Sequence, residues 1–222
     1  MKRIADCVPV GAVLADIGTD HGKLPVYLGQ KGTIKRAVAA DINEMPLQKA
    51  VNNIRDHGLE DIIDTYLTDG LKGIEVFSPD CVVIAGMGGE LIEQILSAST
   101  INVESVRFIL QPMTKEESLR KYLCENGYLI YDEYIVKEGK VYQIICAYYD
   151  GKKRTMTEGE YYLGMVNIEK KDGLLPELIQ KVLKRINVKA EGKRQAGLDV
   201  SSETELIKQI SDIKERAYGD GK

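Results

Sequence analysis

Short apolar runs alternate with amphipathic segments along the first 126 residues. Residues 13–17, 37–40, 62–67, 81–85 and 106–110 are strand-like apolar runs. The segments between them have helical periodicity, over residues 24–30, 46–57, 90–97 and 115–126. Strands that alternate with helices form a parallel sheet covered by helices on both faces. The pattern therefore predicts an α/β fold.

The pattern changes twice in the second half of the chain. Residues 128–136 and 141–149 alternate around Glu138-Gly139-Lys140, which predicts a β-hairpin and one antiparallel strand. A polar linker over 150–154 follows. Apolar stripes over 177–189 and from Ser202 onward then predict a helical hairpin with a loop at 192–197 and a capping box at 202–205. We expect one domain over 1–150 and a coiled-coil-like second domain over 155–222.

Composition and charge exclude several classes of protein. The 222 residues carry a net charge of −4, and no apolar run approaches the roughly 20 residues that span a bilayer. The N-terminal residues lack the apolar segment of a secretory signal. Four scattered cysteines and two distant histidines argue against a zinc site and for free, buried thiols. We expect a cytoplasmic monomer that binds neither a membrane nor a metal.

Polar or glycine residues follow all five predicted parallel strands. Ligands of open α/β sheets bind at the carboxyl ends of the strands, so these residues are expected to line one crevice. They are Asp16 and Gly18, Asp41, Asp69 and Gly70, the segment 86–89, and Gln111 with Pro112.

The loop after the first strand indicates which ligand the crevice holds. A dinucleotide loop requires G-x-G-x-x-G, whereas this one contains Gly18, Asp20 and Gly22 in the order Gly-Thr-Asp-His-Gly. A carboxylate at Asp20 is unfavourable beside a pyrophosphate. S-adenosyl-L-methionine carries a sulfonium and an ammonium, which acids attract. Asp41 is then expected to accept the ribose hydroxyls, while Asp69 and Gly70 contact the adenine.

The strand-end motifs as a set resemble one known family. They are Asp16-Ile-Gly-Thr-Asp-His21, Asp41-Ile-Asn43, Asp69-Gly-Leu71, Ile84-Ala-Gly-Met-Gly-Gly89 and Leu110-Gln-Pro112. In this order and spacing they resemble bacterial TrmK-type tRNA (adenine22-N1)-methyltransferases. The resemblance covers residues 3–150, and the segment 84–89 is its most specific part. It implies a Rossmann-like class I methyltransferase sheet, S-adenosyl-L-methionine as donor, and methylation of N1 of an adenine in the D-arm of tRNA.

The resemblance also implies roles for individual residues. Those expected to bind the cofactor include Asp16, Gly18 and His21 at the methionine end and Asp41 with Ile42 at the ribose. Asp69 and Gly70 are assigned to the adenine, and Gly86 with Met87 lies beside the transferring methyl. Lys23 stands where the family often has an aromatic residue, and we expect it to contact an RNA phosphate.

Adenine N1 has a free lone pair and needs no prior deprotonation. The expected mechanism is therefore mainly the alignment of nitrogen, methyl and sulfur. Asp20 is the candidate catalytic carboxylate for the cationic product, and Met87 the second candidate catalytic residue. The base must leave its stacked or paired position to react.

A basic segment near the C-terminus is the candidate tRNA contact. Between residues 181 and 194, six basic side chains stand against one acid. Four of the six share one helix face, and such a face can follow phosphates. The six are Lys181, Lys184, Arg185, Lys189, Lys193 and Arg194.

Two other functions stay open at this point. One is a small-molecule methyltransferase whose helical hairpin caps the site or mediates dimerisation. The other is a catalytically silent nucleotide-binding module. Salt-dependent affinity for tRNA separates the first alternative from a tRNA methyltransferase, and methyl transfer from a labelled donor separates both enzymes from the silent module.

Overall fold

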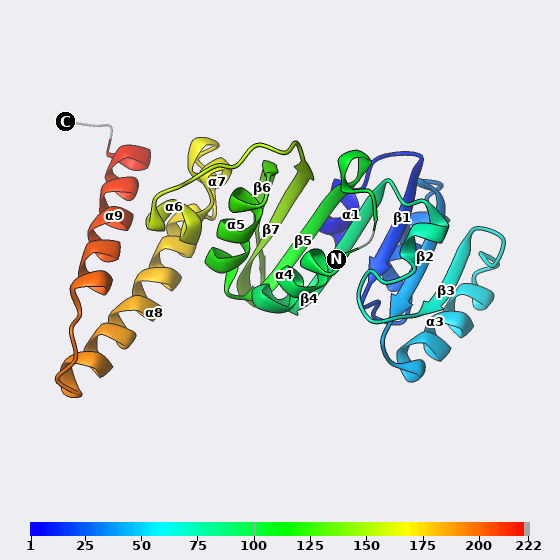
Figure 1. Cartoon of the computed structure of the whole chain (residues 1–222), viewed down its shortest axis with the longest axis horizontal. Helices are drawn as coiled ribbons and strands as arrows, with labels where there is room; N and C mark the ends of the chain where they lie inside the picture. Colours follow the sequence, from blue (N-terminus) through cyan, green and yellow to red (C-terminus); the bar gives the residue numbers. More distant parts are fainter. Residues whose placement is uncertain (100, 220–222) are drawn as a thin grey trace.

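A computed structural model describes residues 1–99 and 101–219, and within them a seven-stranded sheet has the order β3-β2-β1-β4-β5-β7-β6 (Figure 1). β1 to β5 are parallel, β7 runs antiparallel to β5, and β6 runs antiparallel to β7. The predicted mostly parallel α/β sheet with a closing hairpin is confirmed. The strands are β1 Ala12–Ile17, β2 Ile34–Asp41, β3 Ile63–Leu67, β4 Cys81–Gly88, β5 Arg107–Thr114, β6 Tyr128–Glu138 and β7 Lys140–Tyr149.

Helices cover both faces of the sheet, and two further helices extend from one end of it (Figure 1). Residues that alternate along each strand explain the two layers. Leu14, for example, belongs to the core under α1, α2 and α3, while its neighbour Ala15 belongs to the core under α4 and α5. The helices are α1 Lys2–Cys7, α2 Lys23–Gln30, α3 Glu44–Asp56, α4 Gly89–Ser97, α5 Glu116–Glu125, α6 Glu158–Leu163, α7 Met165–Glu169, α8 Leu175–Gln195 and α9 Ser201–Tyr218, with short 3₁₀ turns at Ile74–Phe77 and Val103–Ser105.

The helical hairpin of α8 and α9 forms as predicted, but two details of the prediction are wrong. Gly192 lies inside α8, because the helix runs on to Gln195, and the turn comes at Gly197 with φ of +69°. The N–H of Leu198 bonds to the carbonyl of Lys193, which closes a glycine C-cap. The expected capping box at 202–205 is absent from α9, which begins at Ser201 without a side-chain cap.

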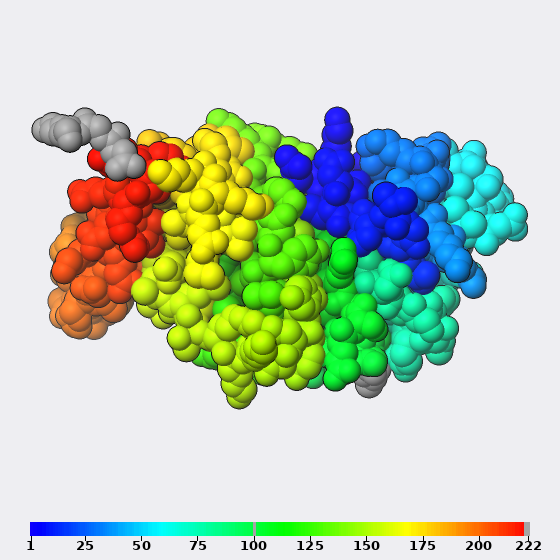
Figure 2. Space-filling model, turned by 90° about the horizontal axis from the view of Figure 1, so that it is seen from above, coloured from blue at the N-terminus to red at the C-terminus, as the bar shows by residue number. Residues whose placement is uncertain are grey.

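The segment between the sheet and α8 contains two short helices that the sequence did not predict. A capping box is present at the start of α6, where the sequence did not predict one. The Thr157 hydroxyl accepts from the Glu160 N–H, and the Glu160 carboxylate accepts from the Thr157 N–H. A third apolar core joins α6, α8 and α9 to Ile135 and Val141 of the β-hairpin. The C-terminal helices therefore pack on the sheet as well as on one another, and Figure 2 shows α8 and α9, in orange and red, at one end of the molecule.

A fully buried ion pair lies at this junction. Arg120 of α5 donates to Glu133 of β6 at 2.7 Å, and both side chains have no exposed surface. The remaining guanidinium nitrogens donate to the Gln143 side chain and to the carbonyl of Tyr161. The other oxygen of Glu133 accepts from the N–H of Val166 at 3.0 Å. The ion pair and its hydrogen bonds thus join α5, β6, β7 and α6 to the start of α7.

Removing one member of this pair is expected to leave a buried charge without a partner. Arg120→Met should lower the free energy of unfolding by about 3–5 kcal/mol, measured by urea denaturation. Arg36→Met is the matched control, because Arg36 pairs with Asp64 at 3.2 Å on the surface and such pairs contribute about 0–1 kcal/mol. Equal effects of the two substitutions would contradict this account.

Candidate active site

The loop after β1 is held by its own backbone and by one buried side chain. The N–H groups of Gly18 and Thr19 both donate to the carbonyl of Ala40 in β2, at 2.8 and 3.0 Å. The Thr19 hydroxyl donates to Asp16 at 2.6 Å and accepts from the N–H of Gly22 at 3.2 Å. Asp16 therefore braces the loop from within.

Asp16 is 7% exposed and lines a cavity, so it can both brace the loop and meet a ligand. Burial raises the pKa of this carboxyl to about 6, against the opposing effect of the Thr19 hydroxyl. A cationic ligand beside it would favour the ionised form. The predicted contact of Asp16 with the donor's charged end is electrostatically consistent with this environment.

Gly18 and Met87 lie in direct contact across the crevice. Gly18 has φ of +73°, and a Cβ built on it would stand 2.1 Å from the terminal methyl of Met87. A larger residue at position 18 would displace this methyl, which is the far end of a flexible side chain. The positive φ is therefore the stronger reason for glycine at this position.

A cavity of about 310 Å³ lies over the ends of β2, β3 and β4. Asp41 stands at its edge, where one oxygen accepts from the N–H of Asn43 at 2.7 Å. Asp69 accepts from Lys72 at 2.6 Å, and Gly70 packs against Ile95. We call this the nucleoside cavity. The sequence prediction named seven of its lining residues, which are Gly18, Asp41, Ile42, Asp69, Gly70, Gly86 and Met87.

A second cavity of about 230 Å³ adjoins the first and shares Gly18, Ala85 and Gly86 with it. Asp16, Asp20 and Lys23 line this loop cavity. Asp20 accepts from Lys23 at 2.6 Å, and this hydrogen bond holds the pKa of the Asp20 carboxyl below its usual value. The structure therefore pairs the proposed catalytic carboxylate with the residue expected to contact a phosphate.

Gln111 of β5, which the sequence analysis placed among the crevice residues without a role, makes a specific contact in the structure. Its side-chain oxygen accepts from the N–H of Gly86 at 3.1 Å. It also lines the loop cavity. The sequence indicates Gln111 as a crevice residue, because this polar residue follows the apolar run of the fifth strand. Its contact with β4 could not be predicted, because that contact depends on the order of the strands in the sheet.

His21, predicted to lie at the methionine end of the donor, stands in the same loop as Asp20. It lines neither of the two cavities. Its backbone has φ of +58°, its carbonyl accepts from the Asn53 side chain at 3.0 Å, and its ring lies 3.7 Å from Asp20. These contacts give His21 a role in shaping the loop.

The six basic residues of α8 are brought together, but most of them have internal partners. Lys181 and Arg185 approach Glu116, and Arg185 also approaches Glu117. Lys189 and Lys193 both contact Glu203 of α9 at 2.9 and 2.8 Å. Arg194 pairs with Glu191 at 3.4 Å. Much of the predicted positive face is therefore neutralised within the fold.

Over residues 1–99 and 101–219, no cluster of three or more histidine, cysteine, aspartate or glutamate side chains is arranged to hold a metal ion. Within that same part of the chain, none of the helices has the length and apolar character needed to cross a membrane.

Comparison with known proteins identifies the family to which this chain belongs. Residues 1–145 match the family model described as a methyltransferase domain. Over 149 residues the chain is 36% identical to the tRNA (adenine(22)-N(1))-methyltransferase of Bacillus subtilis. This alignment covers 66% of this chain and 63% of that protein. The crystal structure of the B. subtilis m1A22 tRNA methyltransferase TrmK aligns with a TM-score of 0.78 and 29% identity, over 98% of this chain and 95% of that one. The chain belongs to the TrmK-type methyltransferase family.

A second structure of similar fold bears on the ligand. A Streptococcus pneumoniae protein crystallised in complex with S-adenosyl-L-methionine aligns with a TM-score of 0.84 and 30% identity, over 96% of both chains. This TrmK-type chain therefore shares its fold with a protein whose structure contains the donor. By sequence, the match spans less than two thirds of the B. subtilis relative's length.

The raised pKa of Asp16 predicts a pH-dependent stability. The fold holds the proton of this carboxyl more tightly than the unfolded chain does, so stability falls as the pH rises from about 4 through about 6, by on the order of 3 kcal/mol. Asp16→Asn keeps an acceptor for Thr19 and removes this loss. Urea denaturation should find the variant more stable than wild type at pH 7.5 and equally stable at pH 4.

The exposed Asp20 offers the control for this substitution. Asp20→Asn removes a carboxylate whose pKa is lowered by Lys23, so it should not stabilise the protein at pH 7.5. A less stable Asp16→Asn variant at that pH would show that the ionised carboxylate is favourably held in the fold.

Proposed function

We propose that this TrmK-type protein transfers a methyl group from S-adenosyl-L-methionine to N1 of an adenine in tRNA, with adenine 22 as the target named for its B. subtilis relative. One observation carries the proposal. Two cavities meet at Gly18 and Gly86, with strand-end carboxylates on either side of that junction. This arrangement suits an elongated ligand that has a nucleoside at one end and positive charge at the other.

The residues present fit the donor. Asp41 and Asp69 offer acceptors to ribose hydroxyls and to an adenine amino group, and Asp16 and Asp20 offer negative charge to the ammonium and sulfonium. At Gly86 a Cβ would meet nothing within 4 Å, so the cavity is open there. When bound, the donor supplies an activated methyl group.

The reaction requires the protein mainly to align the adenine nitrogen, the methyl carbon and the sulfur. The N1 lone pair of adenine forms a bond to the methyl carbon while the carbon–sulfur bond breaks with its electron pair on sulfur. The products are a cationic base and a neutral thioether. No base is needed for the attack, which agrees with a β4 end of Gly86, Met87 and Gly88 that carries no titratable group.

We propose two side chains near the transfer. Met87 lies over Gly18, where it can restrict the donor to one position. Asp20, on the other side of the loop, is proposed to stabilise the cationic product. Its pairing with Lys23 at 2.6 Å means that Lys23 would have to turn away for the carboxylate to act alone.

We propose the α8 face as a tRNA contact. Among the basic residues of that face, Lys184 is exposed and has no carboxylate within 4.0 Å in the part of the chain that the structure describes. Deletion of residues 155–222 would also remove Tyr161 and Val166, which satisfy the buried pair of Arg120 and Glu133. Single substitutions therefore test this contact more cleanly than truncation.

The proposal as a whole is tested by the reaction itself. The purified protein is incubated with unmodified tRNA transcripts and methyl-labelled donor, and the labelled nucleoside is then identified and mapped. We expect 1-methyladenosine at position 22, as the name of the B. subtilis relative states. Labelling of small molecules alone would favour a small-molecule methyltransferase, and no labelling at all would favour a silent binding module.

Asp41→Ala should weaken donor binding. The loss of hydrogen bonds to a charged acceptor costs about 1.5–3 kcal/mol, which corresponds to a dissociation constant raised roughly 10- to 150-fold in titration calorimetry. Asp61→Ala is the control, because Asp61 is exposed just before β3, at the opposite end of the sheet. An unchanged affinity in Asp41→Ala would exclude Asp41 from the nucleoside site.

Lys184→Ala should weaken tRNA binding and reduce its salt dependence, because each lost phosphate contact lowers the slope of log K against log salt by about 1. The control is Lys35→Ala, at the exposed start of β2. Fluorescence anisotropy over a range of salt concentrations measures the slope. If Lys35→Ala has the larger effect, the α8 face is not the contact.

A further inference from the structure

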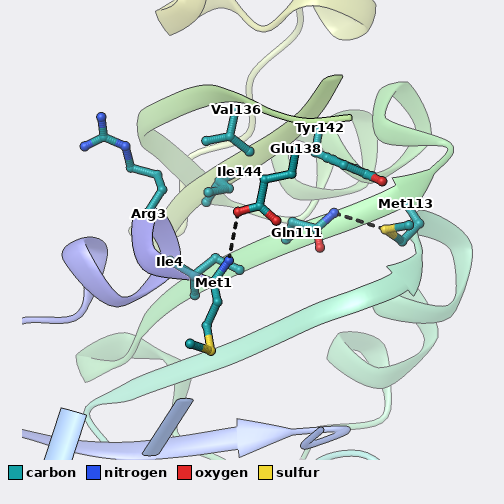
Figure 3. A pocket seen from close by; sticks show the side chains of 9 residues that line it. All are labelled: Met1, Arg3, Ile4, Gln111, Met113, Val136, Glu138, Tyr142 and Ile144. Carbon is teal, nitrogen blue, oxygen red and sulfur yellow. Dashed lines mark hydrogen bonds and ion pairs between the residues drawn. The ribbon is translucent and has the colours of Figure 1, made fainter. Parts of the chain in front are cut away.

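A third cavity continues the crevice beyond the loop cavity. It measures about 230 Å³ and lies between α1, the end of β5 and the tip of the β6–β7 hairpin (Figure 3). It shares Met1, Ile4 and Gln111 with the loop cavity, so the two adjoin. The nucleoside, loop and third cavities therefore form one row along the carboxyl edge of the sheet. The first two are assigned to the donor.

Strand register builds one wall of the third cavity. Val136 of β6 pairs with Tyr142 of β7, so their side chains stand on the same face of the hairpin. Glu138 and Ile144 follow at every second residue and share that face. All four side chains line the cavity, and Figure 3 shows them gathered above α1 and β5.

The lining divides into an apolar floor and a polar rim. Ile4 and Ile144 are buried in the core beneath, and the Tyr142 ring is half-buried. Glu138 is exposed at the mouth, where its carboxylate lies 3.6 Å from the Met1 amino group (Figure 3). A flat apolar ligand with a hydrogen-bonding edge matches this division.

Gln111 connects this cavity to the donor side. Its oxygen accepts from the Gly86 N–H at 3.1 Å, and its nitrogen donates to the Pro112 carbonyl at 3.1 Å and to the Met113 sulfur at 3.4 Å. These three contacts fix the amide between the two cavities. Gln111 is thus a positioning residue at the point where a methyl acceptor and the donor would meet.

We propose that the third cavity receives the target adenine after it leaves the tRNA stack, with Tyr142 as the ring on which the base stacks. This inference rests on the proposed function. An adenine has two apolar faces and one edge with an amino group, and an enzyme that acts on a base in structured RNA holds it by stacking and by contacts to that edge. Glu138 offers an acceptor to the amino group. The base thereby approaches the donor from the side opposite the nucleoside cavity.

Substitution of Tyr142 tests the stacking. Tyr142→Ala should lower kcat/KM for tRNA by about 5- to 150-fold, the loss expected for one stacked base, while calorimetry finds its affinity for S-adenosyl-L-methionine unchanged. Tyr142→Phe keeps the ring and should restore the rate. Tyr148→Ala is the matched control, because Tyr148 lies on the same strand and is exposed at its far end. Equal rates for Tyr142→Ala and Tyr148→Ala would overturn the proposal.

Photo-crosslinking gives a readout independent of turnover. A tRNA with 8-azidoadenosine at the mapped target nucleotide is irradiated with the wild-type protein, and the crosslinked peptides are identified by mass spectrometry. Crosslinks within 136–144 or 111–113 support the proposal, and crosslinks confined to other peptides overturn it. If the wild-type protein methylates no tRNA, the proposed function fails first. If it methylates tRNA but crosslinks elsewhere, only the assignment of this cavity fails.

Discussion

The buried pair of Arg120 and Glu133 connects the sheet to everything that follows it in the chain. Two charges removed from water are stable only when their remaining hydrogen-bonding groups are also satisfied. Here the further partners come from β7, from α6 and from Val166, the second residue of α7. The orientation of the C-terminal helices relative to the hairpin is therefore tied to the same contacts that place β6 and β7 at the edge of the sheet. A base-binding wall made by that hairpin depends on them too.

The space around the buried pair of Arg120 and Glu133 is also restricted. A Cβ at Gly164 would stand 2.5 and 2.6 Å from the two Glu133 oxygens, and its φ is +85°. The chain passes this close because Val166 must reach the carboxylate. Gly18, in the loop after β1, also has a left-handed backbone, but its near neighbour is the movable end of the Met87 side chain. At Gly164 the neighbour is a buried carboxylate held by hydrogen bonds, so only there is the space itself fixed.

Much of the fold was predictable, because the spacing of apolar residues along the chain reflects which side chains are buried in the core. The five parallel strands, the hairpin and the acids at strand ends all follow from that pattern. Gly86 to Gly88 was not predicted as part of β4, since glycine is a poor strand former, and there β4 is held by its pairing with β5. The roles of Gln111 and Tyr142 depend on which strands are neighbours. The internal pairing of the α8 lysines likewise depends on acids distant in sequence, such as Glu116.

The strand order has a consequence for how the protein is made. β7 lies between β5 and β6, although β6 leaves the ribosome first. Until residue 149 has been synthesised, β5 is an open edge with unpaired backbone groups, and such edges are prone to join other chains. β6 cannot cover it, because β6 bonds only to β7 within the part of the chain described. The nascent protein therefore carries an exposed edge next to its future active site until the hairpin arrives as a unit.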